Sequence, residues 1–237
     1  MKIARGLKII DLALYLEDQK TLVIADTHIG YEEALNKQGV LVPRLRAGEL
    51  KKRLITILDG LNLKDIVIAG DVKHEFGTIS ETEWRETIEL LDFLSNYAKI
   101  TLIKGNHDTI LGPIAAKKNI EVVDYLILGD VLILHGHKSL MCFRDNKIKT
   151  IIIGHEHPAV SLGDGLRSER YKCFLKGFWN EKQVVVLPSF NLLTEGEDLT
   201  KTDIKNPLLK DINNFDVFIV ADKVYQFGKF RNLLRKY

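Results

Sequence analysis

The chain has 237 residues, 46% of them hydrophobic and 28% charged, a balance typical of a soluble globular protein. Its net charge of +2 permits a nucleic-acid partner without indicating one, and no apolar run approaches the length of a membrane span. We therefore expect a single cytoplasmic domain over residues 1–237, with no signal peptide and no membrane anchor.

Short β-rich runs bounded by turn residues recur along the chain. The first two, 8–16 and 21–25, are expected to pair across the polar turn 17–20. Further strands are expected at 66–69, 100–103, 122–128, 131–134, 151–153, 184–187 and 217–220. The dipeptide Gly129-Asp130 separates two of these runs and predicts a hairpin.

Amphipathic stretches lie between some of the strands and predict helices. One helix is expected from near Arg44 to Gly60, because Pro43 precedes apolar residues at helical spacing. A second is expected over 81–97, where Ser80 and Glu83 have the spacing of a capping box. Many strands with few helices between them predict an α/β fold, a two-sheet β-sandwich flanked by helices. The polar segment 194–214 is expected to be a long surface loop.

Potential ligands stand at the carboxyl ends of five expected strands, or within three residues of those ends. They belong to five motifs: Asp26-Thr27-His28, Gly70-Asp71-Val72-Lys73-His74, Gly105-Asn106-His107-Asp108, His135-Gly136-His137 and Gly154-His155-Glu156-His157. Ligands of open α/β sheets bind at this edge, where loops from separate strands converge. Together the motifs hold all seven histidines, so chance placement explains them poorly, and we expect one site.

The ligand types indicate a metal site. Imidazole and carboxylate groups without thiolates favour Mn²⁺, Fe or Zn²⁺ over Ca²⁺ or an iron–sulfur cluster. Cys142 and Cys173 are not spaced as CxxC, so neither a disulfide framework nor a thiolate site is expected.

The five motifs, in this order over residues 26–157, resemble the calcineurin-like metallophosphoesterase superfamily. Gly70 to His74 is similar to the SbcD-type nuclease branch. Leu187-Pro188-Ser189-Phe190-Asn191 and Tyr171-Lys172-Cys173-Phe174 resemble SbcD-related archaeal phosphoesterases, and the first of these also resembles ligase-associated ones. The resemblance implies a four-layer αββα fold and an enzyme that hydrolyses phosphate esters with two divalent cations.

The resemblance also implies which residues bind the cations. Asp71 would bridge them, and the remaining ligands would be Asp26, His28 and His157 for one cation and Asn106, His135 and His155 for the other. A shared carboxylate offsets the repulsion between the cations and helps a bridging water lose its proton, so that hydroxide is the expected nucleophile. Mn²⁺ is the first choice of metal, with Fe, Zn²⁺ and Ni²⁺ as alternatives.

His107 is the expected acid for the leaving group, since the matching histidine of the family protonates or stabilises the leaving oxygen. Asp108 is expected to orient it, and an adjacent carboxylate favours the imidazolium that a general acid requires. The alternative, that Asp108 only caps a helix beginning near Thr109, is equally open. His74 is expected near the substrate or the bridging carboxylate, and His137 outside the metal ligands. For each of them, a functional role and structural support are both open.

Several other polar residues are candidates for substrate contact. Arg167, Arg170, Lys172 and Lys176 follow the last ligand motif, where a loop could reach a phosphate-rich substrate, although a solvated charged face is the simpler explanation. Ser189 and Asn191, at another expected strand end, are candidates to line the pocket or to support the ligands.

The leading interpretation is a phosphodiesterase acting on nucleotides or nucleic-acid ends. A diester lacks the dianionic charge that monoesterases grip with extra cations. About 80 residues follow His157, which leaves little room for the DNA-capping domain of SbcD-type nucleases. One alternative is a phosphomonoesterase, such as a nucleotide or protein phosphatase, and another is a catalytically silent scaffold like the retromer-type relatives. The sequence leaves open the oligomeric state and whether a protein partner completes the substrate groove.

Overall fold

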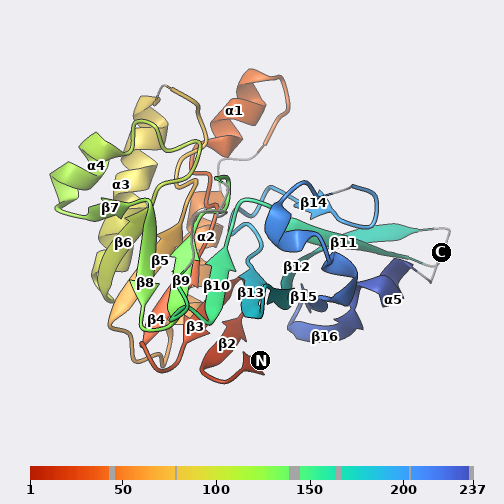
Figure 1. The fold of residues 1–237 in the computed structure, drawn as a ribbon. Helices are drawn as coiled ribbons and strands as arrows, with labels where there is room; N and C mark the ends of the chain where they lie inside the picture. Colours follow the sequence, from red (N-terminus) through yellow and green to blue (C-terminus); the bar gives the residue numbers. More distant parts are fainter. Residues whose placement is uncertain (43–45, 78, 139–144, 164–166, 203, 235–237) are drawn as a thin grey trace.

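A computed structural model describes residues 1–42, 46–77, 79–138, 145–163, 167–202 and 204–234. Its strands form two mixed sheets (Figure 1). The first sheet has the order β1 (Lys2–Ala4), β2 (Leu7–Ile10), β3 (Ala13–Leu16), β4 (Thr21–Ile24), β5 (Asp65–Ala69), β6 (Lys99–Ile103) and β7 (Glu121–Val123). Neighbours from β1 to β4 are antiparallel, whereas β4 to β7 run parallel.

The second sheet contains the later strands. Its order is β14 (Glu197–Asp198), β11 (Pro158–Gly163), β12 (Ser168–Trp179), β13 (Lys182–Val186), β10 (Thr150–Ile153), β9 (Val131–Leu134) and β8 (Tyr125–Leu128), with β15 (Asp216–Val220) pairing β12 and β16 (Val224–Lys229). Strands β9, β10 and β13 run parallel, so their carboxyl ends share one edge.

Helices lie outside the two sheets. They are α1 (Tyr31–Lys37), α2 (Arg46–Leu58), α3 (Glu81–Ser95), α4 (Gly112–Lys118), α5 (Phe230–Leu234) and two 3₁₀ turns, η1 (Pro207–Leu209) and η2 (Ile212–Asn214). Figure 1 shows α3 and α4 on the side of the first sheet that faces away from the second. Among the described helices, none is both long and apolar enough to cross a membrane.

The second sheet is buried on both faces. Val131 and Ile133 of β9 belong to a core shared with the first sheet, while Leu132 and Leu134 pack in an outer core with η1 and α5. Successive side chains of a strand point to opposite faces, so this alternation defines two layers of packing. The expected α/β fold, two sheets flanked by helices, is confirmed.

Two expected strands are each divided in the structure. The run 8–16 turns back at Asp11, whose φ is 55°, and forms β2 and β3, which pair with each other. The run 122–128 is interrupted at Asp124, where the chain leaves the first sheet after β7 and enters the second as β8. Apolar residues flank the single aspartate at each break, so hydrophobicity alone could not locate them. The hairpin at Gly129 is confirmed, with Leu128 opposite Val131.

The expected helices are present as α2 and α3; Arg44, near the expected start of α2, and Cys142 lie outside the described residues. The segment 194–214 is more than a surface loop. It forms β14, η1 and η2, and buries Leu199 and Leu208 against the outer face of the second sheet. Its few apolar residues, including the pair Leu208-Leu209, lie among polar ones without a strand or helix period, so the pattern did not indicate this packing.

Candidate metal centre

The expected ligands follow the carboxyl ends of strands in both sheets. The first sheet contributes Asp26 and His28 after β4, Asp71 after β5 and Asn106 after β6, while the second contributes His135 after β9 and His155 and His157 after β10. Each sheet therefore supplies side chains to one site between the sheet edges.

One group consists of Asp26, His28 and His157, whose candidate ligand atoms all lie within 4.8 Å of one another. The two Nε2 atoms of His28 and His157 are 3.3 Å apart, and His157 Nε2 is 3.5 Å from Asp26 Oδ2. Imidazole nitrogens that face each other so closely need a proton or a cation between them, because two lone pairs repel.

A second group consists of Asp71, His135 and His155, again within 4.8 Å. His135 Nε2 lies 3.3 Å from Asp71 Oδ2 and 3.2 Å from His155 Nδ1. Asn106 joins this group, since its Oδ1 is 3.0 Å from the same His135 nitrogen. Asp71 Oδ2 is also 3.9 Å from His28 Nε2, so this carboxylate faces both groups.

The backbone at these strand ends is strained. Ten described residues other than glycine have positive φ, and five of them are expected ligands: Asp26, His28, Asp71, His155 and His157. Each such residue costs about 1 kcal/mol or more and persists where the surrounding fold enforces it, as at functional sites.

The glycines of three motifs allow ligands from different strands to approach. A Cβ at Gly70 would stand 2.1 Å from His135 Nδ1, and one at Gly105 would stand 2.1 Å from Asp71 Oδ1. A Cβ at Gly154 would lie 2.7 Å from Asp26 Oδ2. All three distances are below van der Waals contact, so the site requires glycine at these positions.

Charge and burial act against each other in the centre. Burial lowers the pKa of His28 to about 3, although Asp26 and Asp71 favour its charged form. Burial also disfavours the charged form of His135, but the hydrogen bond to Asp71 and the charge of Asp26 outweigh it and raise its pKa to about 9. A metal must displace that proton, so cation binding should weaken as the pH falls.

The donor set fits a pair of divalent cations. The buried Asp26 Oδ1 and His28 Nδ1 have no hydrogen-bond partner among the described residues, and an unsatisfied carboxylate oxygen in a buried site is costly. Nitrogen and oxygen donors without sulfur suit Mn²⁺, Fe, Zn²⁺ or Ni²⁺.

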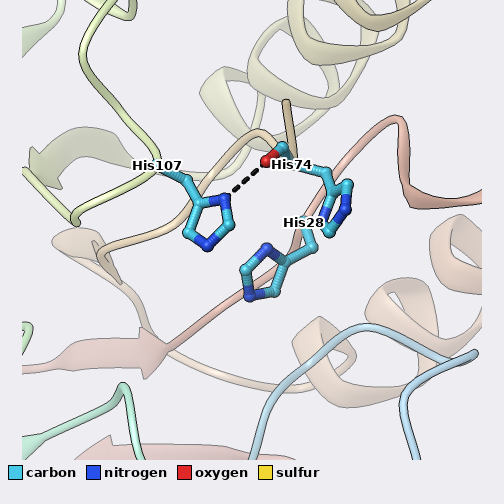
Figure 2. A group of neighbouring side chains, drawn as sticks. All are labelled: His28, His74 and His107. Atoms are coloured by element: carbon cyan, nitrogen blue, oxygen red, sulfur yellow. Dashed lines mark hydrogen bonds between the residues drawn. The ribbon is translucent and has the colours of Figure 1, made fainter. Parts of the chain in front are cut away.

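His107 lies beside these groups, oriented by a backbone carbonyl. Its Nδ1 is 2.5 Å from the carbonyl oxygen of His74, so Nδ1 carries the proton and donates it (Figure 2). Its Nε2 is left facing Asp71, 3.9 Å from Oδ2. His28, His74 and His107 also have ligand atoms within 4.8 Å of one another, and Figure 2 shows their three rings gathered together.

Asp108 contacts the backbone of two ligand loops rather than His107 or the start of α4. Its carboxylate accepts hydrogen bonds from the backbone N–H groups of Val72, at 3.0 Å, and Gly105, at 2.9 Å, so it joins the loops that carry Asp71 and Asn106. It makes no hydrogen bond to His107 among the described residues, and α4 begins only at Gly112 without a side-chain cap. Burial, the largest influence, raises the pKa of Asp108 to about 6.

Ser189, Asn191 and Lys172 support the loop that carries Asp26 and His28. Ser189 Oγ donates to the Asp26 carbonyl at 2.7 Å, and Asn191 Nδ2 donates to the His28 carbonyl at 3.1 Å. Lys172 in turn donates to the carbonyl oxygens of Ser189 and Asn191. Ser189 and Asn191 thus fix the loop that carries Asp26 and His28 through its backbone carbonyls.

Aromatic rings flank the histidines. The Tyr31 ring centroid lies 4.6 Å from that of His74, and the Phe76 centroid lies 4.2 Å from that of His107. Phe76 is 59% exposed, so a large apolar face is open to solvent beside His107. His137 packs against His135, with centroids 5.1 Å apart, and burial lowers its pKa to about 4.

A groove of about 530 Å³ adjoins the centre and is lined by His155, His157, Tyr31, Arg170 and Glu195, among others. Arg170 Nη1 lies 3.2 Å from Glu195 Oε2, so a carboxylate partly offsets the arginine charge at the groove. Arg167 is elsewhere: it follows β11 and lines a different pocket, together with β16 residues. The expectation that Arg167 reaches the substrate is therefore not supported by its position.

Two buried charged residues escaped prediction. Lys73 is fully buried and donates through Nζ to the carbonyl of Glu75. Glu83 is also fully buried, and its carboxylate binds the loop after β5. Lys73 lies inside the Gly70–His74 motif, and this position could have indicated a place near the site. Glu83 was assigned to a capping box with Ser80, so its contact with the loop was not expected.

The chain belongs to the calcineurin-like phosphoesterase family, whose model matches residues 19–222. This membership makes it a metal-dependent phosphoesterase by family. Among solved structures it is similar to the Pseudomonas putida nuclease MPE, with 23% identity and a TM-score of 0.67, covering 93% of this chain and 94% of that one.

Two further solved structures are more distant. An Aquifex aeolicus protein is 20% identical, with a TM-score of 0.38 over 58% of this chain and 78% of its own. Vps29 from Chaetomium thermophilum is 14% identical, with a TM-score of 0.38 over 90% of this chain and 89% of its own. No curated protein sequence matches the chain significantly.

Proposed function

We propose that this protein is a two-metal phosphodiesterase acting on nucleotides or nucleic-acid ends. The observation that carries the proposal is the pair of donor groups around Asp71, contributed by both sheets, with the Nε2 of His107 facing the same carboxylate. Asp26, His28 and His157 would hold one cation, and Asn106, His135 and His155 the other. When bound, the cations supply an activated water and positive charge for the phosphoryl oxygens.

The chain's own groups complete the chemistry. The carbonyl of His74 keeps the proton of His107 on Nδ1, so proton exchange with substrate takes place at Nε2. In the imidazolium form, Nε2–H can donate to the oxygen that leaves phosphorus. Asp108, Ser189 and Asn191 keep the ligand loops in register through backbone hydrogen bonds.

The charges of the groove favour a diester over a monoester. Arg170 is paired with Glu195, and Glu197 adds another acidic side chain to the lining. A monoester dianion gains most from cations that no neighbouring carboxylate neutralises, whereas a singly charged diester has less need of them.

Aromatic surface supports a nucleotide or nucleic-acid substrate. Tyr31 lines the groove and packs against His74, and the exposed ring of Phe76 packs against His107. Unpaired bases stack on such rings with little dependence on sequence. The similar Pseudomonas putida structure is that of a nuclease, which agrees with this substrate class.

The decisive experiment compares Mn²⁺-dependent hydrolysis of a chromogenic phosphodiester with that of its monoester, starting from metal-stripped protein. Asp71→Asn serves as the control against contaminating enzymes, because the bridging carboxylate faces both groups. We expect faster cleavage of the diester and no activity in the variant.

Each alternative has its own outcome in this assay. Faster cleavage of the monoester would move the protein to the phosphomonoesterases, with the same site. Binding of two metals without any hydrolysis would support the scaffold.

We also propose that the protein is related to the SbcD-related archaeal and ligase-associated phosphoesterases. It would form a single domain over residues 1–237 and be located in the cytoplasm.

A further inference from the structure

Glu83 on α3 reaches away from its own helix to the candidate site. Ser80 caps the helix by accepting from the Glu83 N–H at 3.1 Å. In a capping box the glutamate would return this contact to the backbone of residue 80. Instead, Glu83 Oε1 accepts from the N–H groups of His74, at 2.7 Å, and Glu75, at 2.9 Å.

The neighbouring loop makes room for this contact. A Cβ at Gly30 would stand 2.9 Å from Glu83 Cγ, and Gly30 has φ of 91°, which favours glycine. The His74 N–H is shared with the Ile29 carbonyl, at 2.9 Å, whereas Glu75 donates to Glu83. The Glu83 side chain is buried, and Oε1 accepts both N–H groups while Oε2 has no hydrogen-bond partner among the described residues, so its hydrogen bonding is directed at this loop.

The peptide group between His74 and Glu75 links Glu83 to His107. Its N–H donates to the Glu83 carboxylate, and its carbonyl accepts from His107 Nδ1 (Figure 2). The N–H and C=O of a trans peptide point in opposite directions, so Glu83 and His107 hold one peptide from its two sides. A carboxylate on the N–H also polarises the carbonyl and strengthens it as an acceptor.

We propose that Glu83 is a positioning residue that orients His107 through the His74–Glu75 peptide. From the sequence, this role was expected of Asp108. Glu83 fixes the carbonyl, the carbonyl keeps the proton on Nδ1, and Nε2 is thereby directed to the reacting oxygen. The inference rests on the proposed role of His107 in phosphodiester cleavage.

The first test uses the dependence on the leaving group. A dinucleotide releases a poor leaving alkoxide that needs a proton, whereas bis-p-nitrophenyl phosphate releases a phenolate that does not. In the Mn²⁺ enzyme, Glu83→Ala should lower kcat on the dinucleotide about tenfold, with KM unchanged, and change kcat on the aryl diester less than about twofold. Glu83→Gln keeps an oxygen acceptor and should recover most of the loss.

Glu81→Ala is the matched control, because Glu81 is an exposed acid in the first turn of the same helix. It should leave both substrates unaffected. Equal losses on both substrates in Glu83→Ala, accompanied by reduced metal content, would show a merely structural role and overturn the proposal. No loss on the dinucleotide would also overturn it.

The second test does not require activity. In the Zn²⁺-loaded protein, imidazole ¹⁵N NMR should show the His107 proton on Nδ1 in the wild type and in Glu83→Gln, and distributed over both nitrogens in Glu83→Ala. An unchanged His107 spectrum in Glu83→Ala would contradict the inference. If the wild type cleaves no phosphodiester, the proposed function fails, and this spectrum still decides whether Glu83 positions His107.

Discussion

At the level of single residues, the close contact between strand ends depends on glycines, which have no side chain. Gly105 stands against Asp71, where a Cβ would lie 2.1 Å from Oδ1 and 2.3 Å from the backbone nitrogen. We expect Gly105→Ala to displace Asp71 and lower activity more than about 100-fold, because misplacing a catalytic group by an ångström is already costly. Metal content, measured by mass spectrometry, should fall below two ions per chain.

Gly112→Ala is the matched control for this change. Gly112 lies in α4, and a Cβ there meets nothing within 4 Å. Alanine in a helix is favoured over glycine, so this variant should keep full activity and gain up to about 1 kcal/mol of stability. Normal metal content in Gly105→Ala would refute the steric explanation.

His107 itself should show the same selectivity as Glu83, with larger effects. Its Nε2 faces the Asp71 carboxylate but belongs to neither of the two groups assigned to cations. His107→Ala should lower kcat on a dinucleotide about 100-fold or more and on an aryl diester much less, since general acids contribute about 10²–10⁴-fold. Steady-state kinetics with both substrates measures this difference. Equal losses would instead indicate a metal ligand.

The individual candidate ligands could be named from the sequence because chemistry restricts residue types and strand ends restrict position. The structure brings the seven named ligands together. The partners of His107 could not be named, since they depend on the direction of one side chain and one peptide. Asp108 is adjacent to His107 in sequence but turns to Val72 and Gly105, while Glu83 reaches the site from a helix.

At the level of elements, Asp198 joins β14 to its surroundings. Its carboxylate accepts from Ser161 Oγ at 2.5 Å and Thr200 Oγ1 at 2.7 Å. Burial alone would raise the pKa of Asp198, but these hydrogen bonds and that from Lys201 lower it to about 2. The pKa is lower in the folded state than in the unfolded state, so this stabilisation is complete above about pH 4 and disappears as the pH falls towards 2.

Urea unfolding of wild type and Asp198→Asn at several pH values measures this contribution. Asparagine cannot ionise, so the difference in free energy of unfolding should be about 2 kcal/mol near neutral pH and shrink towards zero near pH 2. Comparing the two proteins at each pH cancels the titration of all other groups. A difference independent of pH would show that the charge of Asp198 contributes nothing.

Helices and strands could be predicted where the spacing of hydrophobic residues changes along the sequence. They could not be separated where the same spacing continues from one element into the next. The helices α2 and α3 lie within the expected ranges, and β8 and β9 form the expected hairpin. The break at Asp124 sends consecutive apolar strands into different sheets. Both strands pack partly buried apolar residues against the same core, so only the three-dimensional packing distinguishes them.

At the level of the whole molecule, the candidate centre connects the two sheets. Asp26, His28, Asp71 and Asn106 extend from the first sheet, and His135, His155 and His157 from the second. Cations held by both sets would join the sheets at their carboxyl edges. Because a cation bound only by the folded state adds RT ln(1 + [L]/Kd), Mn²⁺ at 100 times Kd should add about 2.7 kcal/mol to the free energy of unfolding for each cation bound.

Removal of the cations should therefore lower the melting temperature. Two variants distinguish residues that bind the cations from a residue that acts only in catalysis. His155→Ala removes a nitrogen that lies 3.2 Å from His135 Nε2, so it should lose part of the Mn²⁺-dependent stabilisation. His107→Ala should keep all of it while losing activity, because Nδ1 is bound to a carbonyl. Equal melting temperatures with Mn²⁺ and with chelator would mean that the cations do not tie the sheets together. The stability of the fold would then not depend on the cations at the carboxyl edges of the sheets, although catalysis would.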